Sequence, residues 1–253
     1  GETDHRPRIL VGSDTRISCG MLESALVAGI CSAGADALVC GVIPTPGVAY
    51  LTRQHRCDAG VVISASHNSF EFNGIKFFSG DGFKLPDEQE DRIEAIMAID
   101  NGEGADEPRV TGDRIGRREA LPEAAREYAA YLMAEMAVGL RGLTIALDCA
   151  NGAVSAIAPP LFQSLGARVV TMGAEPNGVN INDRCGSTHL AGLCDLVLSS
   201  GACLGFAFDG DGDRMLAVDE RGVPVDGDQI LSILALDMME EGELRNDTLV
   251  VTV

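Results

Sequence analysis

Short apolar runs alternate with longer stretches of helical periodicity along the first part of the chain. The runs predict strands over 8–11, 37–40, 60–63 and 75–78, and the helical stretches are 20–33, 46–53 and 86–99. Strands that alternate with helices are typical of an α/β domain. The polar stretch 101–118 follows and contains four glycines and one proline. It indicates a domain boundary at residue 118.

The same alternation restarts beyond this boundary. It predicts helices over 122–136, 154–165 and 190–200, and strands over 143–148, 167–172, 203–208 and 215–218. We therefore expect two successive α/β domains with mixed sheets flanked by helices, covering residues 1–118 and 119–223. A helix over 230–240 and a strand over the apolar run 248–253 indicate the start of a truncated third domain, 224–253.

Composition and charge exclude some classes of partner. The chain has 253 residues, 46% of them hydrophobic, and a formal net charge of -19. This charge argues against nucleic acid and anionic membranes, because phosphate groups require clustered cations. No apolar run reaches the ~18 residues that span a bilayer. The first residues, GETDHRPR, lack the apolar core of a signal peptide, so we expect a cytoplasmic location.

A cluster of polar side chains follows the apolar strand 60–63. It contains Ser64, Ser66 and His67, which place a nucleophile beside a proton carrier. No GxSxG motif is present, so a hydrolase triad is poorly supported. Lys76, one of only two lysines in the chain, lies in the next strand. Lysine can lose its proton in a tuned site whereas arginine cannot, so Lys76 is a second functional candidate.

Three aspartates alternate with glycines directly after the strand 203–208. Asp209, Asp211 and Asp213 would repel one another strongly unless a cation neutralised them. Carboxylate oxygens are hard ligands that suit Mg²⁺, Mn²⁺ or Ca²⁺. Open α/β sheets bind ligands at such strand ends. The pattern predicts a metal site, and a solvated acidic turn is the alternative.

A non-enzymatic calcium-binding module is another alternative for this loop. The stretch DGDGDRMLAVDE has acids at positions 1, 3, 5 and 12, as in an EF-hand. However, Arg214 occupies position 6, where the EF-hand loop needs glycine, and strands flank the loop. The calcium module is therefore less well supported than a catalytic metal site.

Together, ISASHNSFEFNGIKFF and FAFDGDGDR resemble motifs of the α-D-phosphohexomutase superfamily. The stretches GSDTR, PTPGVAYLTR, LDCANGA, NINDRCGSTH and VDGDQIL fit the superfamily in the same order. The residues that flank the two motifs most resemble those of the bacterial glucosamine branch of the superfamily. Enzymes of this branch interconvert glucosamine 6-phosphate and glucosamine 1-phosphate. This reaction proceeds through a phosphoserine and a sugar bisphosphate intermediate. The phosphomannomutase and phosphoglucomutase branches are the alternative.

The resemblance implies a role for each candidate residue. Ser66 would be the phosphoserine, and Lys76 a candidate for proton transfer at the sugar hydroxyl. His67 would support the loop of residues 64–69, called the serine loop, and Arg214 would help to neutralise the phosphate. Mg²⁺ would be held by one phosphoserine oxygen and by Asp209, Asp211 and Asp213. Ser64 would be a structural hydroxyl, and Asp14 with Arg16 a structural pair.

The chain also departs from the superfamily pattern. Ser69 stands where members usually have proline after SHN, which would loosen the loop. The sugar-reading loop GExSGH and the phosphate-binding loop of a fourth domain have no counterpart in this sequence. We therefore expect the chain alone to lack mutase turnover, with a phosphosugar and its bisphosphate as the partners of the full enzyme. The resemblance is also compatible with a homodimer.

Overall fold

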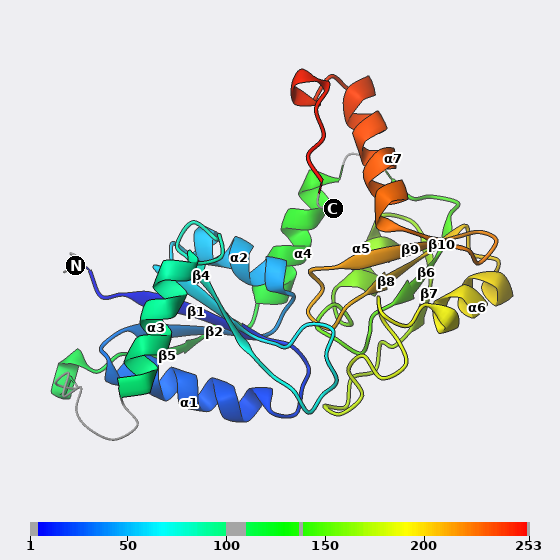
Figure 1. Cartoon of the computed structure of the whole chain (residues 1–253). Helices are drawn as coiled ribbons and strands as arrows, with labels where there is room; N and C mark the ends of the chain where they lie inside the picture. Colours follow the sequence, from blue (N-terminus) through cyan, green and yellow to red (C-terminus); the bar gives the residue numbers. More distant parts are fainter. Residues whose placement is uncertain (1–4, 100–109, 137–138, 252–253) are drawn as a thin grey trace.

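The chain folds into two α/β lobes, each built on a five-stranded sheet (Figure 1). A computed structural model describes residues 5–99, 110–136 and 139–251. The strand orders are β4-β3-β1-β2-β5 in the first lobe and β10-β9-β8-β6-β7 in the second. Within these ranges, no helix is both long and apolar enough to cross a membrane.

The first sheet is parallel except for its edge strand β4. Its elements are β1 (Arg8–Ser13), α1 (Cys19–Ser32), β2 (Asp36–Val42), α2 (Thr45–Gln54), β3 (Ala59–Ile63), β4 (Ile75–Ser79), α3 (Asp87–Ile99) and β5 (Arg118–Ala120). Strand β4 runs antiparallel to β3, and their register pairs Val62 with Lys76. This pairing brings the lysine close to the polar residues that follow β3.

The second sheet is also mixed. Its lobe contains β6 (Thr144–Asp148), α5 (Ala158–Ser164), β7 (Arg168–Met172), α6 (Ala191–Ser200), β8 (Leu204–Phe208), β9 (Met215–Asp219) and β10 (Pro224–Val225). The helix α4 (Ala124–Glu135) precedes β6 and packs against α2 and β2 of the first lobe. Strands β8 and β9 are antiparallel, so the aspartate-glycine loop is the turn between them. The helix α7 (Gly227–Glu240) then extends away from both sheets (Figure 1).

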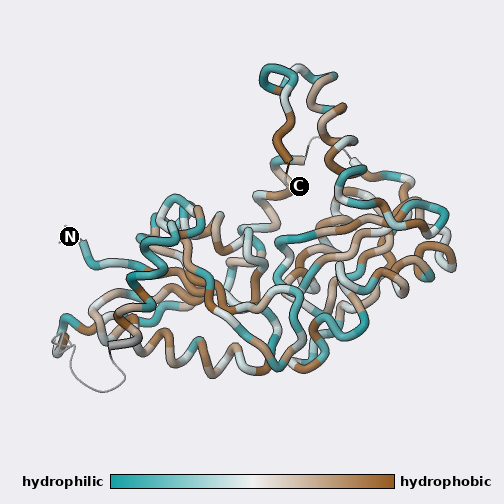
Figure 2. The backbone as a smooth tube through the Cα atoms, viewed as in Figure 1, coloured by the Kyte–Doolittle hydropathy of each residue, from teal (hydrophilic) through white to brown (hydrophobic). Residues whose placement is uncertain are grey.

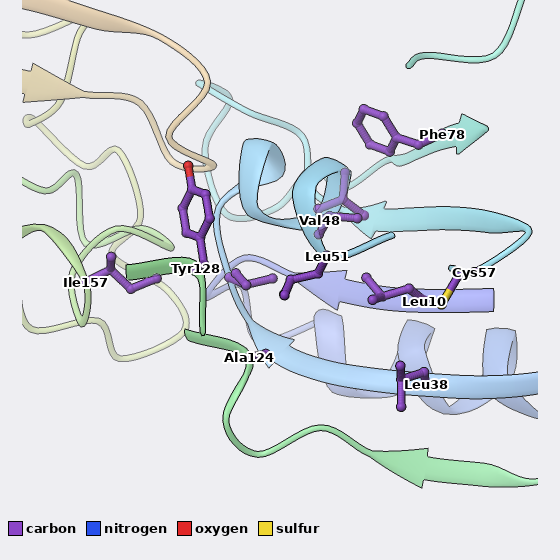
Figure 3. Packing of buried hydrophobic residues seen from close by; sticks show 11 residues of the cluster. Leu10, Leu38, Val48, Leu51, Cys57, Phe78, Ala124, Tyr128 and Ile157 are labelled. Atoms are coloured by element: carbon purple, nitrogen blue, oxygen red, sulfur yellow. The ribbon is translucent and has the colours of Figure 1, made fainter. Parts of the chain in front are cut away.

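One hydrophobic core spans the junction of the two lobes. Leu10, Val48 and Leu51 are fully buried between the first sheet and α2. Tyr128 of α4 and Ile157, just before α5, belong to the same cluster, as Figure 3 shows. Figure 2 shows the apolar positions gathered along the strands of each sheet. Shared burial across the junction stabilises one arrangement of the lobes.

Two expected elements differ in the structure. The strand over 248–253 is wrong for residues 248–251, which have no regular structure; residues 252–253 lie outside the described ranges. Val250 is 89% exposed, and an apolar run forms a strand only where a neighbouring strand pairs its backbone. The helix expected over 154–165 begins at Ala158, because Pro159 and Pro160 fit a first helical turn but not a helix interior.

Two short strands lie at the expected domain boundaries. Strand β5 begins at residue 118 and pairs in parallel with β2 of the first sheet. Strand β10 begins at residue 224 and pairs with β9 of the second sheet. The boundaries at 118 and 223 remain predictions. Both strands escaped the sequence analysis because they are only three and two residues long.

Candidate active site

The loop after β3 places Ser66 against the aspartate loop of the other lobe. Ser66 Oγ donates a hydrogen bond of 2.6 Å to Asp209 Oδ2, across 143 residues of sequence. Ser66 is 8% exposed and has a φ of +52°. This left-handed conformation is unfavourable for a residue other than glycine, and such strain persists only where the surroundings impose it. The proximity of the two loops expected from the sequence is confirmed.

The three aspartates form a compact cluster of possible metal ligands. One carboxylate oxygen from each of Asp209, Asp211 and Asp213 lies within 4.8 Å of the others. Asp209 and Asp211 are fully buried, and Asp213 exposes 32% of its side chain. Asp211 Oδ1 is buried without a hydrogen-bond partner, the one such side-chain atom among the described residues. A hard divalent cation would satisfy this oxygen, so the cluster fits a metal.

Burial and mutual repulsion alter the protonation of the cluster. Burial raises the pKa of Asp209 to about 6, with contributions from the charges of Asp211 and Asp213, although the Ser66 hydrogen bond lowers it. Burial also raises the pKa of Asp211, but hydrogen bonds from Lys76 and Thr45 bring it below its ordinary value. A bound cation would favour the ionised form of all three carboxyl groups.

Lys76 connects the serine-bearing lobe to the aspartate cluster. Its Nζ donates to Asp211 Oδ2 at 2.7 Å and to Asp213 Oδ2 at 3.3 Å. Burial lowers the pKa of Lys76, but the two carboxylates outweigh it and raise the pKa above its usual value. Lys76 is therefore protonated in this arrangement, and its part in proton transfer remains a prediction.

Arg214 and His67 meet at the exposed side of the site. Arg214 Nη1 lies 3.3 Å from His67 Nδ1, and both side chains are exposed at this contact. The Arg214 backbone N–H donates to Asp209 Oδ1 at 3.1 Å, which fixes where its side chain leaves the loop. The guanidinium is thus available to an anion beside Ser66. The roles expected for both residues remain predictions.

A buried ion pair between Asp14 and Arg16 supports the serine loop. Arg16 Nε donates to Asp14 Oδ2 at 2.9 Å, and neither side chain is exposed. Ser64 Oγ donates to the same carboxylate at 2.7 Å and accepts from the Ser66 backbone N–H at 2.9 Å. In this structure Asp14 and Arg16 form a supporting pair, and Ser64 is a structural hydroxyl.

Removing the buried carboxylate is expected to destabilise the first lobe. Asp14→Ala would leave the Arg16 charge buried and unpaired, which costs about 3–5 kcal/mol of unfolding free energy. Urea denaturation followed by circular dichroism measures this loss. Asp113→Ala, at an exposed site, is the matched control and should change stability by less than about 0.5 kcal/mol. A similar small effect for both variants would contradict the supporting role.

Two residues without an assigned role in the sequence analysis also join the site. Thr45, at the start of α2, donates through Oγ1 to Asp211 Oδ2 at 2.6 Å and through its backbone N–H to Asp211 O at 2.9 Å. Asn182 Nδ2 donates to the backbone oxygens of Ser66 and Asn68, both at 2.9 Å. Thr45 lies in PTPGVAYLTR and Asn182 in NINDRCGSTH, two stretches that fit the superfamily. Membership of these stretches was the one sign in the sequence that the two residues belong to the site.

Comparison with known families agrees with this geometry. The phosphoglucomutase/phosphomannomutase α/β/α domain I profile matches residues 1–102, and the domain II profile matches residues 126–222. The chain belongs to this phosphohexomutase family. Both loops of the site lie inside matched regions, one in each domain.

Individual relatives resemble the chain over its whole length. A phosphoglucosamine mutase of Acetivibrio thermocellus is 54% identical over 252 residues, covering 100% of this chain and 56% of that protein. A phosphoglucosamine mutase of Clostridium novyi is 53% identical with the same coverage. A solved phosphoglucomutase/phosphomannomutase family protein of Burkholderia thailandensis is 25% identical, with a TM-score of 0.78 over 93% of this chain and 51% of its own. The chain thus spans about half the length of the relatives it matches.

The serine loop and the aspartate loop pack so closely that position 210 has room only for glycine. A Cβ at Gly210 would lie 2.6 Å from Ser66 O and 2.8 Å from Asn182 Nδ2. Gly210→Ala would therefore push the serine loop away, and we expect a loss of about 1–3 kcal/mol of unfolding free energy in urea denaturation. Gly20→Ala, in α1 with no atom within 4 Å of the added methyl group, should instead stabilise by about 0.5–1 kcal/mol. Equal effects would contradict the close packing.

Proposed function

We propose that this chain carries the phosphoryl-transfer site of a phosphoglucosamine mutase. In this proposal Ser66 carries the phosphoryl group, and the substrates are glucosamine 6-phosphate, glucosamine 1-phosphate and their bisphosphate. The observation that carries the proposal is the contact of Ser66 Oγ with Asp209 Oδ2, in a cluster that retains an unpartnered Asp211 oxygen. Relatives named phosphoglucosamine mutase that match the whole chain support the choice of sugar.

The protein groups around Ser66 have distinct tasks in this chemistry. When a bisphosphate phosphorylates the enzyme, Ser66 Oγ forms a bond to phosphorus and the phosphorus–oxygen bond to the sugar breaks. The hydrogen bond to Asp209 orients the serine oxygen for this attack, and the Asp209 carboxylate takes up the serine proton as the bond to phosphorus forms. Lys76, which is protonated beside Asp211, gives a proton to the departing sugar oxygen. Arg214, at the exposed side, stabilises the charge on the phosphoryl oxygens, and His67, which contacts Arg214, supports the serine loop.

Mg²⁺ is the metal we propose for the aspartate cluster. Asp209, Asp211 and Asp213 would hold it, since carboxylates are the hard ligands that this ion binds. When bound, it supplies charge neutralisation for the phosphoryl oxygens.

A cytoplasmic location belongs to the same proposal, and so does a small phosphorylated sugar as partner. The net charge of -19 supports the exclusion of nucleic acid and anionic membranes as partners. Two phosphates and a sugar are a compact ligand, and the exposed Arg214 side chain, which lies beside His67, offers a cation to such an anion.

Phosphoryl transfer from three sugar bisphosphates tests the proposal. The protein is incubated with Mg²⁺ and the 1,6-bisphosphate of glucosamine, glucose or mannose, and phosphate on the protein is followed over time. We expect transfer from all three at similar rates, because the sugar-reading loop has no counterpart in this sequence. The choice of sugar is tested in the full enzyme, where turnover should be fastest on glucosamine 1-phosphate; equal rates there on the glucose, mannose and glucosamine 1-phosphates would contradict the glucosamine branch and leave the phosphohexomutase chemistry intact. No transfer from any donor would contradict the proposed function as a whole.

A further inference from the structure

We propose that Asn182 is a positioning residue for phosphoryl transfer at Ser66. Together with Arg16, it forms a clamp on two backbone oxygens of the serine loop, and this clamp directs Ser66 Oγ to Asp209. The inference rests on the proposed function, because positioning matters only if Ser66 reacts. The proposal means that Asn182, a residue of the second domain, controls the conformation of the serine loop in the first domain.

The clamp consists of two donors that converge on the same pair of acceptors. Arg16 Nη2 donates to Ser66 O at 3.0 Å and to Asn68 O at 2.9 Å. Asn182 Nδ2 donates to the same two oxygens, each at 2.9 Å. Each carbonyl oxygen has two lone pairs, so both oxygens are fully satisfied by one donor from each domain. Asn182 is 7% exposed and Arg16 is 2% exposed, so water cannot readily replace either donor.

The clamp holds a backbone conformation that Ser66 would not adopt by itself. The left-handed φ of +52° at Ser66 is disfavoured for residues with a side chain. Fixing the oxygens of Ser66 and Asn68 prevents the peptide planes around Ser66 from rotating to a relaxed conformation. The strained conformation is what lets Ser66 Oγ reach Asp209 Oδ2 at 2.6 Å. The hydrogen bonds of the clamp therefore offset the strain at Ser66 and keep Ser66 Oγ oriented towards Asp209.

The second domain presents Asn182 in one orientation. Asn182 itself has a φ of +57°, a conformation that asparagine tolerates better than most residues. Its backbone N–H donates to Ala150 O at 2.9 Å. The buried Asp148 carboxylate accepts hydrogen bonds from the backbone N–H groups of Ala150 and Gly186, at 2.9 and 2.6 Å. These contacts join the turn after β6 to the loop that bears Asn182, so its amide group is held before substrate arrives.

The two interdomain contacts of Ser66 are consequently coupled. Its carbonyl oxygen is held by Asn182, and its hydroxyl is held by Asp209, both from the second domain. In Figure 1 the cyan segment after β3 approaches the yellow segment before α6, which contains Asn182, whereas Asp209 lies in the turn between β8 and β9. Loss of the Asn182 donor would let the serine loop relax while the metal cluster stays intact, because Asn182 makes no hydrogen bond to an aspartate of the cluster.

Asn182→Asp tests the clamp with little change in shape. The carboxylate replaces the donor by an acceptor that faces two carbonyl oxygens, and aspartate tolerates the left-handed conformation. Asn180→Asp is the matched control, since it adds the same charge two residues away. Asn180 Nδ2 donates to Glu175 O at 3.0 Å, outside the serine loop. Both variants are compared with the unmodified chain.

Three measurements are made on each protein. They are the single-turnover rate of Ser66 phosphorylation by glucosamine 1,6-bisphosphate with Mg²⁺, amide hydrogen exchange over residues 64–69, and Mg²⁺ affinity. For Asn182→Asp we expect phosphorylation about 30-fold slower, as for the loss of two hydrogen bonds. We also expect faster exchange confined to residues 64–69, with Mg²⁺ still bound and the rate compared at saturating Mg²⁺. Asn180→Asp should match the unmodified chain in all three.

The remaining outcomes separate the clamp from the proposed function. Unchanged exchange in Asn182→Asp would overturn the clamp. Faster exchange with an unchanged phosphorylation rate would overturn the positioning role. If the unmodified chain and the control are not phosphorylated at all, the proposed function fails and the positioning role fails with it. In that case, local exchange would still show whether the clamp holds the loop.

Discussion

Replacing Ser66 with alanine is expected to abolish phosphoryl transfer to the protein, with a rate loss of more than about 10⁴-fold. The reason is chemical, because alanine removes the hydroxyl that contacts Asp209, and the other hydroxyl beside the aspartates, Thr45 Oγ1, is hydrogen-bonded to Asp211 instead. Alanine and serine have similar difficulty with the left-handed φ of +52°, so the backbone should be retained. Incorporation of labelled phosphate from a sugar bisphosphate measures the loss.

Ser69→Ala is the matched control for this variant. Ser69 is exposed and lies three residues beyond Ser66 in the same loop. It should incorporate phosphate at the rate of the unmodified chain, and thermal melting should show that both variants remain folded. Full incorporation by the Ser66 variant would contradict the assignment of the nucleophile.

Asp213→Asn is expected to weaken Mg²⁺ binding by at least about 100-fold. Loss of a residue that only orients a metal ligand weakens binding by up to about 100-fold, and loss of a direct ligand should cost at least as much. Asp213 is the partly exposed member of the cluster, with 32% of its side chain accessible, so this variant should fold. Transfer at fixed low Mg²⁺ should fall in parallel and recover when Mg²⁺ is raised. Isothermal titration calorimetry measures the affinity, and chelation by EDTA should remove transfer from the unmodified chain.

Asp195→Asn provides the control for the lost charge. It removes one negative charge from an exposed position in α6 of the same domain, away from the cluster. Its Mg²⁺ affinity should equal that of the unmodified chain. Equal affinity in both variants would contradict Asp213 as a ligand. Tight Ca²⁺ binding without any phosphoryl transfer would instead favour the calcium-binding alternative.

The chemistry-bearing residues could be predicted from sequence because each motif is incomplete alone. Three adjacent carboxylates require a cation, and a serine at a strand end requires a partner that relieves charge. These requirements, together with the order of the family motifs, pointed to contact between Ser66 and Asp209. The alternation of apolar runs and helical stretches likewise predicted most elements, because it reflects which faces are buried.

The supporting contacts could not be predicted, because local sequence does not encode distant partners. Thr45 and Asn182 are separated from the residues they hold by 166 and at least 114 positions. Neither a threonine at a helix start nor an asparagine in a loop is unusual by itself. The strand expected over 248–253 was wrong for a related reason, since an apolar run does not reveal whether a neighbouring strand is present.

The location of phosphate on the protein tests the central claim most directly. The unmodified chain is incubated with Mg²⁺ and glucosamine 1,6-bisphosphate, digested, and its phosphorylated residue is identified by fragmentation mass spectrometry. The account predicts one phosphate, on Ser66, which depends on intact Asp209, Asp211 and Asp213. Phosphate on Ser64, His67 or Ser69, or no phosphate under conditions in which Mg²⁺ is bound, would contradict it.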